Sequence, residues 1–354
     1  MILVTGGAGF IGSNFIRGWR SRHDEPVVNL DALTYAGSTA SLAGLAALTD
    51  YHFVQGDVRD RALVASLLAR YQPRAIVHFA AETHVDRSIE GPEAFAQTNV
   101  LGTLSLLQES LRYWQSLSEA ARATFRYLQV STDEVYGSLD TGEAAFSETS
   151  PFEPNSPYAA SKAAADHFVR AFNRTYGLPT LTTHCSNNYG PYQFPEKLIP
   201  LMIRNALAGE ALPVYGDGQQ VRDWLYVADH CEALERTLSA GQPGGSYAIG
   251  GHNEVRNLDL VQTLCEFLDE IRPRSHPYAG LVRFVADRPG HDRRYAIDAT
   301  RAANELGWTP RKNWREGLRS TLQWYLDNLD WMAQAQSPDF SAWVQRNYNE
   351  RAQA

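Results

Sequence analysis

Two adjacent carboxylates, Asp133 and Glu134, are the residues whose types and spacing most clearly suggest chemistry. They follow an apolar run at 127–130 that is typical of a buried parallel strand. Ligands of open α/β sheets bind outside the carboxyl ends of the strands, where this pair would lie. Two acids there are costly unless they do chemistry or have partners. Neighbouring carboxylates also push their pKa values apart, so one can stay protonated while the other is charged.

This use of both acids sets a geometric condition. Consecutive residues of a regular strand point to opposite faces. Asp133 and Glu134 can therefore serve one pocket only if the strand ends at Thr132, and we predict that it does.

A second pair, Tyr158 and Lys162, is spaced four residues apart and would share one face of a helix. Ser156 is a good N-cap and Gly177 a good C-terminal stop, so we predict a helix over 157–176. A lysine favours the phenolate by charge, and a nicotinamide cation nearby would add to this. Together they could lower the pKa of the phenol from about 10 towards neutrality. The alternative is an ordinary helix tyrosine and a surface lysine.

Glycines at positions 6, 9 and 12 lie between an apolar run at 1–5 and an amphipathic segment at 14–22. This spacing suits a tight turn whose backbone approaches a pyrophosphate at a helix N-terminus. The next predicted strand ends in Asp31, where an acid can accept hydrogen bonds from the adenosine ribose. We therefore predict bound NAD rather than NADP, against the alternative of a structural turn.

Predicted strands alternate with helices along the first half of the chain, which indicates a doubly wound, Rossmann-type parallel sheet. Beyond it, residues 187–200 are rich in Asn, Gly, Pro and aromatics. We predict two interleaved lobes: a cofactor-binding lobe of 1–189 plus about 222–250, and a smaller α/β substrate lobe of about 190–221 plus 251–354.

Several single residues allow two interpretations. Asp57 either faces the adenine or caps a helix that starts near Arg59, and His84 lies in the pocket or on the surface. His78, in the middle of a predicted strand, is expected in the core. Basic residues of the second lobe could hold a diphosphate, and we favour two of them. The candidates are Lys197, Arg222, Arg288 and Arg294, with Arg222 and Arg288 favoured.

Composition argues against several functions. The 354-residue chain has 32 basic and 40 acidic residues, a net charge of −8, which disfavours nucleic-acid binding. Its three cysteines show no metal or disulfide spacing, so we expect no metal and a cytoplasmic protein. No apolar run approaches the ~18 residues of a membrane span, and no signal peptide is evident.

These motifs together resemble the extended short-chain dehydrogenase/reductase family and, within it, the nucleotide-sugar 4,6-dehydratases. The resemblance spans nearly the whole chain, and its specific part is the Asp133–Glu134 pair, which related 4-epimerases generally lack. Two departures are mild: Thr83 replaces a common serine, and Ser38 a common asparagine.

The resemblance implies conversion of dTDP-glucose to dTDP-4-keto-6-deoxyglucose and water. Tyr158 would be the base at the sugar 4-hydroxyl, supported by Lys162 and Thr132. Glu134 would take the proton from carbon 5, and Asp133 would protonate the departing 6-hydroxyl.

The resemblance also implies two sets of binding residues. The NAD set is Gly6, Gly9, Phe10, Ile11, Gly12, Asp31, Leu33, Thr34, Asp57, Val58, Ala80, Ala81, Thr98, Tyr158, Lys162 and Asn188. The substrate set is Thr83, Thr132, Asn187, Lys197, Leu198, Pro213, Tyr215, Arg222, Asn257, Arg288 and His291. A homodimer formed through helices at 92–114 and 157–176 is implied too. The open alternatives are a 4-epimerase, a dehydratase of another nucleotide sugar such as UDP-glucose, and a non-catalytic dinucleotide-binding module.

Overall fold

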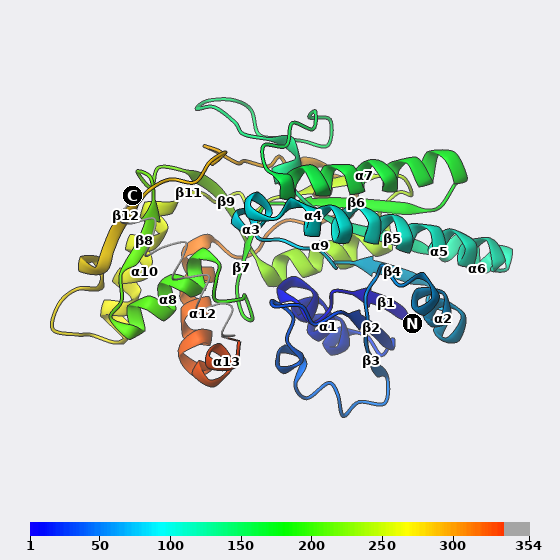
Figure 1. The fold of residues 1–354 in the computed structure, drawn as a ribbon, viewed down its shortest axis with the longest axis horizontal. Coiled ribbons are helices and arrows are strands. Elements are labelled where there is room, and N and C mark those ends of the chain that lie inside the picture. The colour runs from blue at the N-terminus through cyan, green and yellow to red at the C-terminus, as the bar shows by residue number, and fades with distance from the viewer. Residues whose placement is uncertain (336–354) are drawn as a thin grey trace.

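The computed structural model describes residues 1–335. Its larger part is built around a seven-stranded sheet (Figure 1). Its strand order is β10-β6-β5-β4-β1-β2-β3, and all its strand pairs are parallel. The order reverses at β1, which confirms the predicted doubly wound, Rossmann-type sheet. Its strands are β1 (Ile2–Thr5), β2 (Val27–Asp31), β3 (Tyr51–Gln55), β4 (Ala75–His78), β5 (Arg126–Thr132), β6 (Thr180–Cys185) and β10 (Ser246–Ile249).

Helices cover both faces of this sheet, and the strands alternate apolar side chains between them. Ile2 and Val4 of β1 join the core that contains α1, α9 and α11, while Leu3 joins the core that contains α2, α5 and α7. These helices are α1 (Phe10–Arg22), α2 (Arg61–Tyr71), α5 (Thr103–Ser116), α7 (Pro157–Tyr176), α9 (Val227–Ala240) and α11 (Thr300–Leu306). Short helical segments connect them: η1 (Thr39–Leu42), α3 (Val85–Glu90), α4 (Pro92–Phe95), η2 (Ala96–Gly102), α6 (Glu119–Thr124) and η3 (Asp133–Tyr136).

Two predicted helices differ from the structure in detail. The helix predicted over 92–114 is interrupted by the π-helical segment η2, and α5 continues it to Ser116. The helix after β3 starts at Arg61 and is capped by Asp60, whose side chain accepts from Leu63 N. Asp57 is therefore not its N-cap; it pairs instead with Arg59. The helix over 157–176 has the predicted bounds, with Ser156 accepting from Ala159 N and Gly177 left-handed at φ +73°.

A second group of elements packs around its own apolar core (Figure 1). β11, β9 and β7 form a three-stranded sheet, and β12 pairs with β8. The strands are β7 (Asn187–Tyr189), β8 (Leu212–Tyr215), β9 (Val221–Tyr226), β11 (Glu254–Arg256) and β12 (Val282–Val285). The helices are α8 (Leu198–Ala208), α10 (Asn257–Ile271), η4 (Tyr278–Leu281), α12 (Trp314–Asp327) and α13 (Leu329–Gln334).

The chain crosses between the two groups more than once. α9 packs on the large sheet, and β10 is one of its strands. The segment around α11 returns as well: Ala302, Leu306 and Trp308 lie in the core of the large sheet, although the sequence placed them in the second lobe. The indole N–H of Trp308 donates to the carbonyl of Asp229 in α9 at 3.0 Å. Within residues 1–335, no helix has the length and apolar character needed to cross a membrane.

Candidate active site

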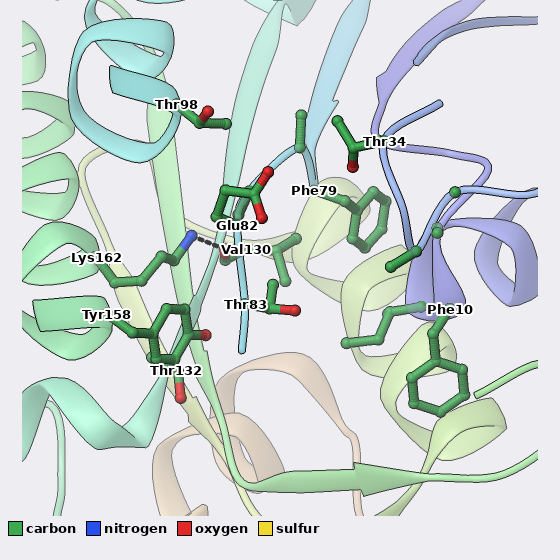
Figure 2. A pocket seen from close by; sticks show the side chains of 18 of the residues that line it. Phe10, Thr34, Phe79, Glu82, Thr83, Thr98, Val130, Thr132, Tyr158 and Lys162 are labelled. Atoms are coloured by element: carbon green, nitrogen blue, oxygen red, sulfur yellow. Dashed lines mark hydrogen bonds between the residues drawn. The ribbon is translucent and has the colours of Figure 1, made fainter. Parts of the chain in front are cut away.

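A cavity of about 570 Å³ opens at the carboxyl ends of the central strands. Its walls contain both pairs of residues that the sequence singled out, Asp133 with Glu134 and Tyr158 with Lys162. Figure 2 shows Tyr158, Lys162 and Thr132 on one side of this cavity and Phe10 on the opposite side. The parallel strands thus bring residues from distant parts of the sequence to one edge of the sheet.

The glycine-rich turn between β1 and α1 fits a dinucleotide. Gly6 has φ +72°, and a Cβ there would lie 2.5 Å from the backbone nitrogen of Ala80. A Cβ at Gly12 would lie 2.3 Å from the carbonyl oxygen of Gly6. Only glycine permits this close packing of turn, helix and neighbouring strand, which leaves the backbone bordering the cavity without side chains.

Asp31 holds this turn in place. Its carboxylate accepts hydrogen bonds from the backbone N–H groups of Ala8 and Leu33, each at 2.8 Å. Burial raises the pKa of Asp31, and these two hydrogen bonds oppose the rise. The carboxylate borders the cavity at the end of β2, the position from which an acid can meet a ribose.

Most of the predicted cofactor residues line the cavity. Leu33 is the exception: it adopts a left-handed conformation at φ 52° and shapes the turn after Asp31. The lining members are Gly6, Gly9, Phe10, Ile11, Gly12, Asp31, Thr34, Asp57, Val58, Ala80, Ala81, Thr98, Tyr158, Lys162 and Asn188.

The acid pair meets its geometric condition. β5 ends at Thr132, and the chain turns at once into the 3₁₀ segment η3, with the Thr132 hydroxyl accepting from Glu134 N at 3.3 Å. Strand alternation therefore stops before the acids, and both Asp133 and Glu134 border the same cavity.

The two acids experience different electrostatic environments. Burial is the largest cause that raises the pKa of Asp133 well above its usual range, followed by the charges of Glu134 and Asp223. One carboxyl oxygen of Asp133, Oδ2, is buried without a hydrogen-bond partner. Burial also raises the pKa of Glu134, but Arg288, Arg222 and Lys197 oppose that rise. The surroundings thus raise the pKa of Asp133 further than that of Glu134, which suits a proton donor beside a base.

Tyr158 and Lys162 lie on one face of α7, but their electrostatics differ from the prediction. Burial, followed by the charge of Glu134, raises the pKa of Tyr158 well above its ordinary value. The Lys162 ammonium, 5% exposed, donates to the carbonyl of Val130 at 2.9 Å (Figure 2). The protein residues by themselves therefore do not lower the pKa of the Tyr158 phenol as expected. The second positive charge in that expectation belongs to the nicotinamide ring.

The predicted substrate residues divide into two groups. Thr83, Thr132, Asn187 and Lys197 line the cavity, and Lys197 donates to the carbonyl of Thr83 at 3.0 Å. The others come from the second group of elements and do not line it: Leu198, Pro213, Tyr215, Arg222, Asn257, Arg288 and His291.

Arg222 and Arg288 nevertheless approach the cavity closely enough for their charges to lower the pKa of Glu134. Arg222 is buried over the ring of Tyr295, 4.3 Å from its centroid. Arg294 instead pairs with Glu254 at 2.7 Å.

The two histidines are now placed. His78 is buried in the core between the hydroxyls of Thr5 and Thr103, as predicted. His84 is buried as well, which excludes its surface interpretation. Its imidazole lies 4.0 Å from the carboxylate of Glu196.

Sequence reasoning missed several lining residues, including Phe79, Glu82, Cys185, Gln193 and Glu196. Phe79 and Glu82 flank the predicted Ala80–Ala81 pair after β4, so their position at a strand end was the available signal. Gln193 and Glu196 belong to the irregular connection between β7 and α8, for which the sequence has no periodicity to guide a prediction.

Comparison with known proteins identifies the class. The model of the GDP-mannose 4,6 dehydratase family matches residues 3–321. The chain belongs to this family.

The names of individual relatives are more specific than the description of the family. A dTDP-glucose 4,6-dehydratase of Xanthomonas campestris pv. campestris is 59% identical over 333 residues, 93% of this chain and 94% of the relative. A dTDP-glucose 4,6-dehydratase of Shigella flexneri is 51% identical and covers 99% of both chains. Among solved structures, a dTDP-glucose 4,6-dehydratase of Streptomyces venezuelae with NAD and TYD bound has a TM-score of 0.86 at 46% identity, covering 95% of this chain and 99% of that one. A UDP-glucose 4-epimerase of Thermus thermophilus with NAD has a TM-score of 0.80 at only 29% identity, covering 92% and 99%.

Proposed function

We propose that this protein is an NAD-dependent dTDP-glucose 4,6-dehydratase, a lyase that forms dTDP-4-keto-6-deoxyglucose and water. The observation that carries the proposal is the acid pair at the end of β5, one acid held neutral by burial and the other surrounded by cations. A 4-epimerase needs the tyrosine but no such pair, since it loses no water. The named relatives at 51–59% identity support dehydration and the dTDP-sugar.

NAD, held at the glycine turn and Asp31, would take up the hydride from carbon 4 and return it to carbon 6. Tyr158 receives the proton of the sugar 4-hydroxyl, and Thr132 bonds the 4-oxygen. Lys162 supplies the positive charge that favours this transfer. The Thr132 side chain opposes the rise in the pKa of Tyr158, and both side chains lie on the same side of the cavity (Figure 2), which suits contact with one sugar oxygen.

Asp133 and Glu134 catalyse the elimination of water. Once carbon 4 is a ketone, the proton on carbon 5 is acidic, and Glu134 removes it as general base. Asp133 gives its proton to the 6-hydroxyl, which leaves as water, and carbon 5 is reprotonated as the hydride returns to carbon 6. Both functions require the acids in opposite protonation states at the same pH, which is the state their surroundings favour.

The substrate's diphosphate is assigned to basic residues of the second group of elements. Arg222 and Arg288 approach the cavity from that side, and their guanidinium groups suit bidentate contact with phosphate oxygens. The remaining predicted substrate residues are assigned to the sugar and the base. We assign the chain to two interleaved lobes with the predicted bounds, apart from two changes. β7 and β9 belong with the substrate lobe because they pair there with β11, and 299–308 belongs with the cofactor lobe because its side chains pack there.

A panel of nucleotide sugars tests the activity. With dTDP-glucose the product should be lighter by one water, and mass spectrometry measures this directly. UDP-glucose and GDP-mannose serve as comparisons for the base. Preferential dehydration of UDP-glucose would replace the dTDP assignment while retaining the reaction.

A homodimer formed through the helices predicted at 92–114 (α4, η2 and α5) and 157–176 (α7) is part of the proposal. Leu101, Phe168 and Tyr176 of η2 and α7 are large apolar side chains left exposed, as expected of a face that a second copy covers. Light scattering should report a dimer, and Phe168→Glu should shift it towards monomer. The three buried free cysteines suit a reducing compartment, and we propose the cytoplasm.

A further inference from the structure

Asp166 is a buried carboxylate of α7 that the reaction outlined above does not use. It lies four residues after Lys162, so Tyr158, Lys162 and Asp166 follow one another along the same helix face. Its Oδ2 accepts a hydrogen bond from the Ser131 hydroxyl at 2.5 Å, and its Oδ1 is buried without a hydrogen-bond partner. A buried carboxylate is costly unless charge and hydrogen bonds compensate for it, which points to a specific use.

The hydrogen bonds of Asp166 lead to both halves of the site. Ser131 directly precedes Thr132, so this contact fixes the end of β5 against α7. On the other side, the imidazole Nε2 of His184 lies 3.2 Å from Asp166 Oδ2. His184 Nδ1 in turn lies 3.1 Å from the hydroxyl of Tyr136, which belongs to η3, the turn that carries the acid pair.

Apart from Asp166, few groups that can carry a negative charge lie near Lys162. Burial lowers the pKa of Lys162, and Asp166 is the leading charge that opposes this effect, ahead of Cys185 of β6. From β4, His78 faces it as a neutral imidazole, its pKa lowered to about 3 by burial and by the Lys162 charge. From β5, the ammonium meets only the Val130 carbonyl. Asp166 itself also faces the phenols of Tyr127 and Tyr136.

We infer that Asp166 is a positioning residue for the oxidation step: it acts through Lys162, one turn before it on α7, and through Ser131, which fixes the end of β5. This inference rests on the proposed function, because it assigns a use to a group behind the proposed Tyr158 and Lys162. Without the carboxylate, the buried ammonium gives up its proton at lower pH, and Tyr158 loses the positive charge that stabilises its phenolate.

The test is the pH dependence of NADH formation in a single turnover of the holoenzyme with dTDP-glucose. In Asp166→Asn the alkaline limb of the rate should move to lower pH, with the rate at a fixed pH on that limb falling about tenfold per pH unit of the move. KM should change by less than about twofold, because Asp166 does not border the cavity. Asp166→Glu keeps the charge and should restore the limb at least in part.

Asp229→Asn is the matched control, since Asp229 is another buried helical carboxylate, which accepts from the backbone of Arg311 and Lys312. It should lower the Tm without moving the limb. A uniform loss of rate in Asp166→Asn with the limb in place would overturn the inference, because a purely structural role gives that result.

If Asp166→Asn does not fold, Ser131→Ala replaces it: the carboxylate stays but loses its hydrogen bond, and a smaller shift in the same direction is expected. An unmoved limb in Ser131→Ala would then reject the inference. If the parent protein forms no NADH from dTDP-glucose, the proposed function itself fails, which separates the two outcomes.

Discussion

Replacing Glu134 by glutamine is the perturbation that separates the two halves of the proposed reaction. The side chain keeps its size and its place on η3, next to Asp133, but an amide cannot accept a proton from carbon 5. Tyr158 and Lys162, which act before that step, come from α7 and stay in place, and removal of the Glu134 charge lowers the pKa of Tyr158, which favours its phenolate. The substitution should therefore spare oxidation at carbon 4 and block elimination.

The size of the effect follows from the surroundings of Glu134. Burial raises its pKa, which makes it a stronger base, while the charges of Arg288, Arg222 and Lys197 oppose that rise. A general base tuned in this way contributes about 10²–10⁴-fold, or roughly 3–5 kcal/mol. We expect the rate of water loss to fall by about that factor and the rate of NADH formation to change by less than about threefold.

Rapid-mixing absorbance at the NADH band, followed by quenching and mass spectrometry, measures both steps in one experiment. In the parent, the NADH signal should rise and decay within each turnover. In Glu134→Gln it should rise and persist, and the sugar recovered from heavy water should contain no deuterium at carbon 5. Glu148→Gln is the control, because Glu148 accepts a hydrogen bond from Ala248 N but does not border the cavity. Normal deuterium uptake at carbon 5 in Glu134→Gln would refute the assignment of the base.

Three further outcomes follow from the site. Asp133→Asn should stall water loss after normal oxidation. Because burial raises the folded-state pKa of Asp133, the substitution should also raise the Tm relative to the parent. This difference in Tm should grow from about pH 4 towards neutrality and disappear in acid. Gly12→Ala places a Cβ against the Gly6 carbonyl and should weaken NAD binding by about tenfold or more in calorimetry, whereas Gly280→Ala, with open space around it, should not; equal affinities would contradict the packing argument. Asp31→Ala should reduce the preference for NAD over NADP in turnover assays, and a parent protein that uses both equally well would remove the ribose argument.

Local patterns were enough to predict the parts of the site that lie at element ends. The apolar run before Asp133 predicted the strand, and the need for two acids in one pocket predicted its end at Thr132, where β5 does end. Ser156 and Gly177 predicted both ends of α7 because capping depends on a few neighbouring residues. The glycine spacing predicted the turn for the same reason.

Features that depend on the path of the whole chain were not predictable in this way. The π-helical segment η2 inside a long helical pattern has no local signal in the sequence. Residues 299–308 pack on the large sheet through Trp308, although their neighbours in sequence belong to the other group. The sequence also contains no local signal that burial raises the pKa of Tyr158, because burial depends on segments that are far apart in the chain.

Asp133 and Glu134 distinguish the proposed dehydratase from an epimerase. The most direct test is the mass of the nucleotide sugar recovered after the purified protein acts on dTDP-glucose in heavy water. We expect a product lighter by one water that carries one deuterium at carbon 5. A product of unchanged sugar composition, an epimer with no solvent deuterium on carbon, would contradict it.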